Sequence, residues 1–234
     1  MITADRQLVE QVRAALAAAA DPDKAAPMRA YMKSSMPFLG VQKPARVAAL
    51  RPLFRSRRLP DRDCWESTIR MLWNDAAYRE HRYAAIDLAR HGAYRSWATD
   101  LRSLGLYDHV IVTGAWWDYV DDVAIRLVGP LRRTHPGDLD QIIRRWSRDP
   151  DRWRRRAAVI CQVGAREETD LALLTACVLD NAADPDFFLR KGIGWALRDF
   201  AKTDPEWVLA FASAYQSRLS PLSLREATRN LHRL

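Results

Sequence analysis

The chain has 234 residues, of which 37 are lysine or arginine and 29 are aspartate or glutamate, so its formal net charge at pH 7 is +8. Its length suits one domain or a short repeat array with a sizeable core. A hydrophobic content of 48%, with nine tryptophans, excludes a disordered chain. The basic charge favours an anionic partner, and nucleic acid is the richest candidate.

The three cysteines, Cys64, Cys161 and Cys177, are widely spaced, and no C-x-x-C pair occurs. This spacing argues against a disulfide framework, a zinc ribbon and an iron–sulfur cluster, and it suits a reducing cytoplasm. No apolar run approaches transmembrane length, so we expect no membrane partner. The first twenty residues carry charges throughout, which predicts a helix rather than a signal peptide.

Apolar residues recur at helical spacing along nearly the whole chain, while glycine and alternating β-branched residues are scarce. A capping side chain followed by proline marks a helix start, because proline suits the first helical position. In chain order, such pairs occur at Asp21-Pro22, His135-Pro136, Asp149-Pro150, Asp184-Pro185, Asp204-Pro205 and Ser220-Pro221. These signals predict an all-α fold of ordinary helices joined by short loops.

A degenerate repeat of about 35–37 residues relates four segments, which are Tyr83–Ile86, Val120–Val123, Arg156–Val159 and Lys191–Gly194. This period fits stacked helical pairs of the HEAT kind, and such arrays curve and present a concave face. We therefore predict a HEAT-like helical-repeat solenoid that forms a single domain over residues 1–234. The second helix of each pair would place four residues on one surface, namely Asp121, Arg156, Lys191 and Trp195.

Two stretches are rich in arginine. The segment Arg144–Arg156 holds seven arginines and two aspartates. It is either a phosphate-binding surface, since binding there releases counterions, or a solvated helical face, and the sequence favours neither. The second stretch consists of Arg51, Arg55, Arg57, Arg58 and Arg62. We expect these arginines to lie on the surface at the end of a helix; the alternative is a contact along a nucleic-acid backbone.

The sequence WWDYVDD puts two adjacent tryptophans within one helical turn of three carboxylates. On a helix, Trp116 and Trp117 point roughly 100° apart, so one can face the core while the other faces a groove. Trp116 is the better core candidate. The carboxylates Asp118, Asp121 and Asp122 lie at i, i+3 and i+4 and share one helix face.

Trp195 lies between Gly194 and Ala196, small neighbours that leave room for its ring in the core or direct it into a cleft. No third ligand or histidine spacing accompanies the carboxylates, so we predict no metal site. The chain lacks nucleophile-elbow, Walker and dinucleotide-binding motifs. We therefore expect no cofactor, and a hydrolase built on a Ser–His–Asp triad, zinc or ATP is poorly supported.

Six segments together resemble the AlkD-type alkylpurine DNA glycosylases, a family of HEAT-like repeats that excises alkylated bases. The segments are Met28–Lys33, Phe38–Pro44, Trp116–Asp121, Arg156–Ala158, Lys191–Arg198 and Leu222–Ala227. The resemblance covers nearly the whole chain. The set with its intervals is specific, whereas any one segment alone is not.

By position, the resemblance implies that Asp121 is the catalytic carboxylate and that Trp117 and Trp195 are the cleft tryptophans. It also implies that Arg156 binds the DNA phosphate. Tyr31 and Gln42 match residues that support the damaged strand; the alternative is that they are ordinary helix and loop residues. Lys191 and Lys33 are candidate phosphate contacts, with a solvated surface as the equal alternative.

The function that the resemblance implies is a monofunctional DNA glycosylase that binds double-stranded DNA on its concave face. It would release cationic N3- or N7-alkylated purines, such as 3-methyladenine and 7-methylguanine, without base flipping and leave an abasic site. We expect a cytoplasmic, nucleoid-associated monomer in a bacterium. One alternative is a non-catalytic HEAT-like protein that binds distorted or branched DNA, which the retention of Asp121, Trp117 and Trp195 disfavours. Another is a protein–protein scaffold, against which the basic charge argues.

Overall fold

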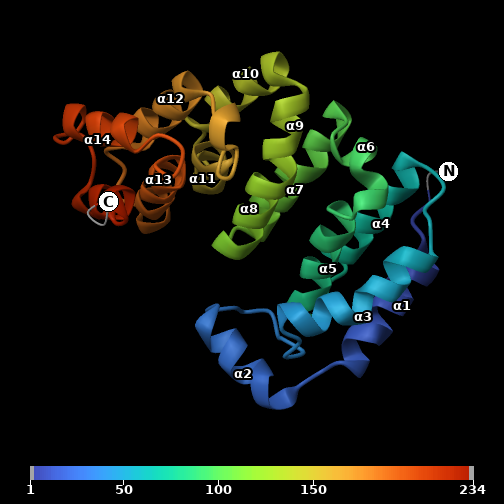
Figure 1. The fold of residues 1–234 in the computed structure, drawn as a ribbon. Helices are drawn as coiled ribbons and strands as arrows, with labels where there is room; N and C mark the ends of the chain where they lie inside the picture. Colours follow the sequence, from blue (N-terminus) through green and yellow to red (C-terminus); the bar gives the residue numbers. More distant parts are fainter. Residues whose placement is uncertain (1–2, 232–234) are drawn as a thin grey trace. The chain divides into compact units, whose positions relative to one another are not determined.

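The structure of the protein is a computed structural model that describes residues 3–231. These residues form helices and contain no strand (Figure 1), which confirms the all-α, helical-repeat fold. They belong to two compact units, bounded as Met1–Ala98 and Thr99–Leu234, and each unit has buried apolar residues of its own. Within the described residues, no helix is long and apolar enough to cross a membrane.

The first unit packs four of its helices, α1, α3, α4 and α5, against one another. In chain order its elements are α1 (Arg6–Ala18), α2 (Pro22–Tyr31), α3 (Lys43–Ser56), α4 (Arg62–Asn74), α5 (Arg79–Ala89), the 3-10 turn η1 (Gly92–Tyr94) and α6 (Arg95–Ala98). Apolar residues at helical spacing give each packed helix a buried face. Trp65 and Trp73 of α4 are fully buried there, so these two tryptophans serve the core.

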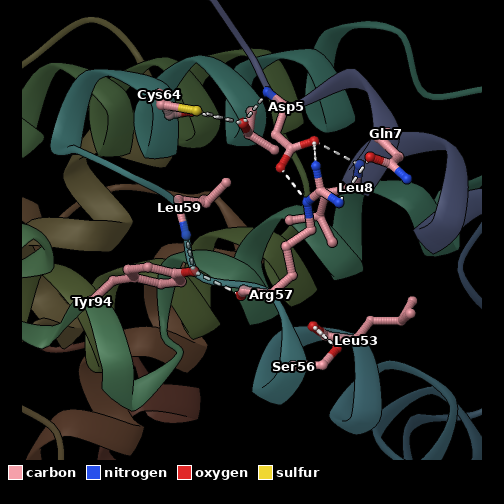
Figure 2. A network of polar contacts seen from close by, with 10 residues as sticks. Asp5, Gln7, Leu8, Leu53, Ser56, Arg57, Leu59, Cys64 and Tyr94 are labelled. Carbon is pink, nitrogen blue, oxygen red and sulfur yellow. Dashed lines mark hydrogen bonds and ion pairs between the residues drawn. The ribbon is translucent and has the colours of Figure 1, made fainter.

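A polar network joins the N-terminal helix to the rest of the first unit (Figure 2). The Asp5 carboxylate caps α1 by accepting from the Leu8 amide at 2.9 Å, and it also accepts from Nη2 of Arg57 at 2.9 Å. The backbone amide of Asp5 donates to the Thr68 hydroxyl of α4 at 2.9 Å. Because Arg57 directly follows α3, the network connects α1 to both α3 and α4. The charge of Arg57 is balanced by the carboxylate of Asp5.

In the second unit, helices α8, α11, α13 and α15 form a row in which each helix packs against the next. Helices α10, α12 and α14 pack along one side of this row (Figure 1). The elements of the unit are η2 (Leu101–Ser103), α7 (Leu104–Gly114), α8 (Trp117–Val123), η3 (Ala124–Val128), α9 (Gly129–Thr134), α10 (Pro136–Trp146), α11 (Arg152–Ile160), η4 (Arg166–Glu168), α12 (Leu171–Asn181), α13 (Phe187–Phe200), α14 (Pro205–Ala214) and α15 (Pro221–Thr228). This row carries the candidate site.

The predicted repeat is visible in the starts of α11 and α13. Each helix is preceded by the sequence Asp-Pro-Asp, and the side chain of the first aspartate stabilises a turn there. Asp149 accepts from the amide of Asp151 at 2.8 Å, and Asp184 accepts from the amide of Asp186 at 2.7 Å. The second aspartate then caps the helix. Both helices therefore begin two residues later than their Asp-Pro pairs predict, whereas the other four pairs start α2, α10, α14 and α15 as predicted.

Helix α8 runs on through the π-helical segment η3 into α9. Pro130 lies in α9, where its ring cannot donate a hydrogen bond and crowds the carbonyl four residues earlier, and the wider π turn accommodates it. The neighbouring Gly129 approaches α11 closely, since a Cβ atom there would lie 2.4 Å from the carbonyl oxygen of Cys161. The helix that carries the candidate carboxylates is thus held tightly against α11.

Candidate functional site

A buried ion pair between Asp121 of α8 and Arg156 of α11 forms the centre of the candidate site. Arg156 donates from Nε to Oδ1 at 2.6 Å and from Nη2 to Oδ2 at 2.7 Å. This bidentate geometry is the strongest that a guanidinium and a carboxylate can form. Asp121 is 9% exposed and Arg156 is 5% exposed. The structure therefore brings together two predicted site residues that lie 35 positions apart in the sequence.

The remaining terminal nitrogen of Arg156 donates to the carbonyl oxygen of Phe188 in α13. Gly192 lies one turn further along α13, and a Cβ atom there would lie 3.1 Å from Nη1 of Arg156. Arg156 consequently joins three helices, and its guanidinium holds Asp121 in place. A phosphate contact by Arg156 stays a prediction, and it must use the N–H groups that Asp121 and Phe188 leave.

The surroundings of Asp121 favour its protonated form more than water does. Burial raises the pKa of the Asp121 carboxyl above its ordinary value of 3.8, because the carboxylate loses hydration. Arg156 opposes this rise, and the charges of Asp118 and Asp122 add to it. A carboxylate with a raised pKa and a fixed orientation is typical of a group that takes part in chemistry.

The two candidate cleft tryptophans are half-buried, and each shares a helix with another residue of the site. Trp117 is the first residue of α8, one turn before Asp121. Trp195 lies in α13, one turn after Lys191. Residues four apart lie on one helix face, so each ring is on the same side of its helix as a charged site residue. Their contact with a substrate stays a prediction.

Trp116, which was the better core candidate, is half-buried like Trp117, and it packs in an aromatic cluster. Its ring centroid lies 6.2 Å from that of Trp153 and 5.5 Å from that of Phe188. Edge contacts of this kind add to the stabilisation that burial provides. Because the Phe188 carbonyl also accepts from Arg156, the cluster supports the backbone that holds the ion pair.

Lys191 forms a second ion pair, again between residues 35 apart, with Glu226 of α15 at 2.8 Å. Arg198 donates to the same carboxylate. Helix α15 approaches α13 closely at Gly194, where a Cβ atom would lie 2.4 Å from Cβ of Glu226. This packing fixes the segment that carries Trp195. A phosphate contact by Lys191 stays a prediction, and its ammonium would then serve both the phosphate and Glu226.

The other three candidates, Tyr31, Lys33 and Gln42, belong to the first unit and are exposed. Tyr31 ends α2 and is 76% exposed, which is unusual for a large aromatic residue. Lys33 has a φ of 47°, in the left-handed region, and Gln42 immediately precedes α3. A joint role of these residues with Asp121, which belongs to the second unit, stays a prediction.

A buried carboxylate that the sequence analysis missed, Glu80 of α5, fixes the backbone before Gln42. Glu80 is 0% exposed and accepts from the amides of Leu39 at 3.0 Å, Gly40 at 2.9 Å and Val41 at 3.0 Å. A glutamate in the first turn of a helix is ordinarily a surface residue that favours the helix dipole. Nothing in its spacing distinguishes it from such a residue.

Five of the seven arginines between residues 144 and 156 pair with carboxylates of the same unit. The pairs are Arg148–Asp180, Arg152–Asp186, Arg154–Asp108, Arg155–Asp184 and Arg156–Asp121. The partners lie in other helices or in the turn before α13, so these charges join the repeats. The sequence did not predict these pairs, while the exposure of Arg144, Arg145, Arg148 and Arg152 agrees with a solvated helical face. Within residues 3–231, no group of three His, Cys, Asp or Glu side chains could hold a metal ion.

Known proteins share this fold and sequence pattern. Residues 12–231 match the family described as DNA alkylation repair enzyme, and the chain belongs to that family. A solved structure described as a predicted DNA alkylation repair enzyme from Enterococcus faecalis is similar, with a TM-score of 0.82 and 29% identity over 92% of this chain and 98% of that chain. No protein of curated function matches the chain. Membership of the family gives the protein a role in the repair of alkylated DNA, with DNA as its partner.

Proposed function

We propose that the protein is an AlkD-type, monofunctional DNA glycosylase of base-excision repair. It hydrolyses the N-glycosidic bond of cationic N3- or N7-alkylated purines in double-stranded DNA and leaves an abasic site. The observation that most supports this proposal is the buried Asp121 carboxylate, which Arg156 holds in a bidentate pair. We further propose that it acts as a monomer, with both units forming one DNA-binding domain, on the nucleoid in the cytoplasm.

The chemistry of the substrate explains why one carboxylate suffices. Alkylation at N3 or N7 gives the purine a positive charge, so the base departs as a neutral molecule without a proton from the protein. The deoxyribose that remains is oxocarbenium-like, and the protein must stabilise this developing positive charge. Asp121 supplies a poorly hydrated negative charge for that purpose. It also orients the water that attacks C1′ and accepts the proton that this water loses.

The tryptophans complete the proposed mechanism. The half-buried rings of Trp117 and Trp195 pack against the deoxyribose, and their faces favour a cationic centre. The candidate residues include no set of donors and acceptors suited to reading a base edge, so in this proposal the lesion remains stacked rather than flipped. Selectivity then comes from the leaving group, since only a cationic base departs with this amount of help.

The first test is the range of lesions that the wild-type protein releases. With duplexes that carry one lesion each, we expect release of 7-methylguanine and no comparable release of hypoxanthine, because a neutral base is a poorer leaving group. Free base is measured by mass spectrometry, and strand cleavage should require alkali because the product is an abasic site. Equal release of hypoxanthine contradicts the proposed selectivity. Binding of DNA without release of any base would support the non-catalytic alternative.

The rate of base release at saturating DNA should fall as the pH falls, with a midpoint above 3.8, the ordinary pKa of an aspartate. Burial raises the pKa of Asp121, so protonation removes its negative charge at a higher pH than for a solvated carboxyl. Single-turnover rates, corrected for spontaneous depurination, give the midpoint, and circular dichroism checks that the protein stays folded. A profile flat down to pH 3.8 would show that the ionisation of Asp121 does not control the rate.

A further inference from the structure

The second arginine-rich stretch separates, in the structure, into paired and unpaired residues. Arg57 pairs with Asp5, and Arg62 pairs with Glu66 at 3.0 Å. Arg51, Arg55 and Arg58 are exposed, and among residues 3–231 none of the three has a carboxylate partner. Exposed arginines without partners remain available to an external anion.

Arg51 and Arg55 line a groove of about 360 Å³ between α3 and the end of α5. Lys43 of α3 and Arg90, which directly follows α5, line it as well, so four cationic side chains surround the space. The apolar lining comes from α3 and consists of Val47, Leu50 and Phe54. Val47 is 37% exposed, which leaves part of this apolar surface open to a ligand.

The groove has a strongly positive charge balance. The one carboxylate in its lining is Asp87, which already accepts from Nε of Arg46 at 2.7 Å. No unpaired negative charge therefore offsets Lys43, Arg51 and Arg55. Cations arranged in this way bind phosphate groups by direct contact and by release of counterions.

The spacing of the cations suits a chain of phosphates better than a single anion. Lys43, Arg51 and Arg55 follow one face of α3, which rises about 1.5 Å per residue. Arg51 and Arg55 are thus about 6 Å apart along the helix axis, and Lys43 lies about 12 Å before Arg51. An apolar wall beneath such a row fits the C–H face of deoxyribose, which a free phosphate ion lacks.

We propose that this groove, formed by α3 and α5, binds the sugar-phosphate backbone of duplex DNA. The choice of DNA as the occupant rests on the proposed function, while the charge, spacing and apolar wall are properties of the first unit itself. The groove is a backbone contact in addition to the predicted contacts of Tyr31, Lys33 and Gln42. It positions the duplex without reading its sequence.

The experiment introduces a single negative charge into the groove. Gly92 lines it, and a Cβ atom at this position would meet nothing within 4 Å, so a larger side chain fits without displacing the protein. Gly92→Glu should weaken binding of an undamaged duplex about tenfold at low salt. Gly92→Gln has the same size without the charge, and Gly137→Glu adds the same charge at another open glycine, in α10. Both should bind like the wild type in fluorescence anisotropy.

A second variant tests the phosphate contacts directly. Replacing Arg51 and Arg55 together with alanine should reduce the slope of log affinity against log salt by about two, because each phosphate contact contributes about 0.9. Arg102 and Arg133, two exposed arginines that already pair with Asp100 and Glu168, provide a double-alanine control with the same change in charge. Thermal unfolding of all variants shows that the fold is intact.

The outcomes separate this inference from the proposed activity. Equal affinities of Gly92→Glu and Gly92→Gln, with an unchanged salt slope in the Arg51/Arg55 variant, would overturn the groove as a DNA contact, whether or not the wild type releases 7-methylguanine. If the groove variants lose affinity but the wild type releases no base, the glycosylase proposal fails and the groove contact stands.

Discussion

Replacing Asp121 with asparagine should slow base release strongly while duplex binding is retained or strengthened. Asparagine keeps the shape but removes the charge that is proposed to stabilise the oxocarbenium-like sugar. Loss of one such electrostatic contact typically costs about 100- to 1000-fold in rate. Binding should not suffer, because the substitution also removes a negative charge that repels the phosphates. Single-turnover release of 7-methylguanine and the dissociation constant for the same duplex are measured in parallel.

The same substitution has a structural cost that needs its own control. An asparagine can accept from one nitrogen of Arg156, but its amide group opposes the other, and a buried guanidinium loses its counter-charge. Disrupting a buried pair in this way costs about 3–5 kcal/mol. The nearest control is Asp140→Asn, because Asp140 accepts from Nε of Arg132 at 2.6 Å and from its Nη2 at 3.2 Å, and Arg132 is 6% exposed. Arg132 keeps a second carboxylate, Asp170 at 2.9 Å, so the loss of stability should be smaller than in Asp121→Asn.

We expect Asp140→Asn to lower stability and to leave base release intact in the folded protein. Rates are therefore compared at a temperature at which circular dichroism shows each variant to be folded. If the two variants lose release equally once the folded fraction is taken into account, Asp121 acts only by supporting the fold, and the proposed catalytic role is wrong.

The repeat was predictable from the sequence because equivalent positions recur at a fixed interval. Asp121 and Arg156, and likewise Lys191 and Glu226, are 35 residues apart and meet across adjacent helices of one row. The sequence does not reveal that these charges pair with each other, since a pairing depends on the distance between helices. Gly194 sets one such distance by admitting α15 close to α13.

The carboxylate partners of the segment Arg144–Arg156 could not be predicted from the sequence. Its seven arginines suggested a surface, because the two aspartates inside the segment cannot balance them. The balancing carboxylates lie far along the chain, as in the pair of Arg154 with Asp108 at 2.7 Å. Net charge along a segment therefore overestimates the charge available to DNA. Arg51 and Arg55, which have no such partner within the described residues, are better candidates than most of the denser cluster.

Replacing Glu80 with alanine should strongly destabilise the first unit. Glu80 accepts three backbone N–H groups, and each buried N–H left without a partner costs about 1–3 kcal/mol. We expect the free energy of unfolding to fall by about 3–5 kcal/mol, less than the largest possible sum, because Leu39 is only partly buried and water can reach its amide. Urea denaturation measures the change.

The backbone at this point has little freedom to adjust to that loss. Gly40 has a φ of +85°, and a Cβ atom there would lie 1.9 Å from the carbonyl oxygen of Asp21, so the segment passes directly against the start of α2. Glu80→Gln keeps the oxygen that serves two of the amides and turns an amide group toward the third, so its loss should be smaller than that of Glu80→Ala. Glu10→Ala, at an exposed position of α1, should change stability by no more than about 0.5 kcal/mol. If Glu80→Ala is as stable as Glu10→Ala, the carboxylate does not hold the segment before Gln42, and the conformation there must come from Gly40 and the packing of its neighbours.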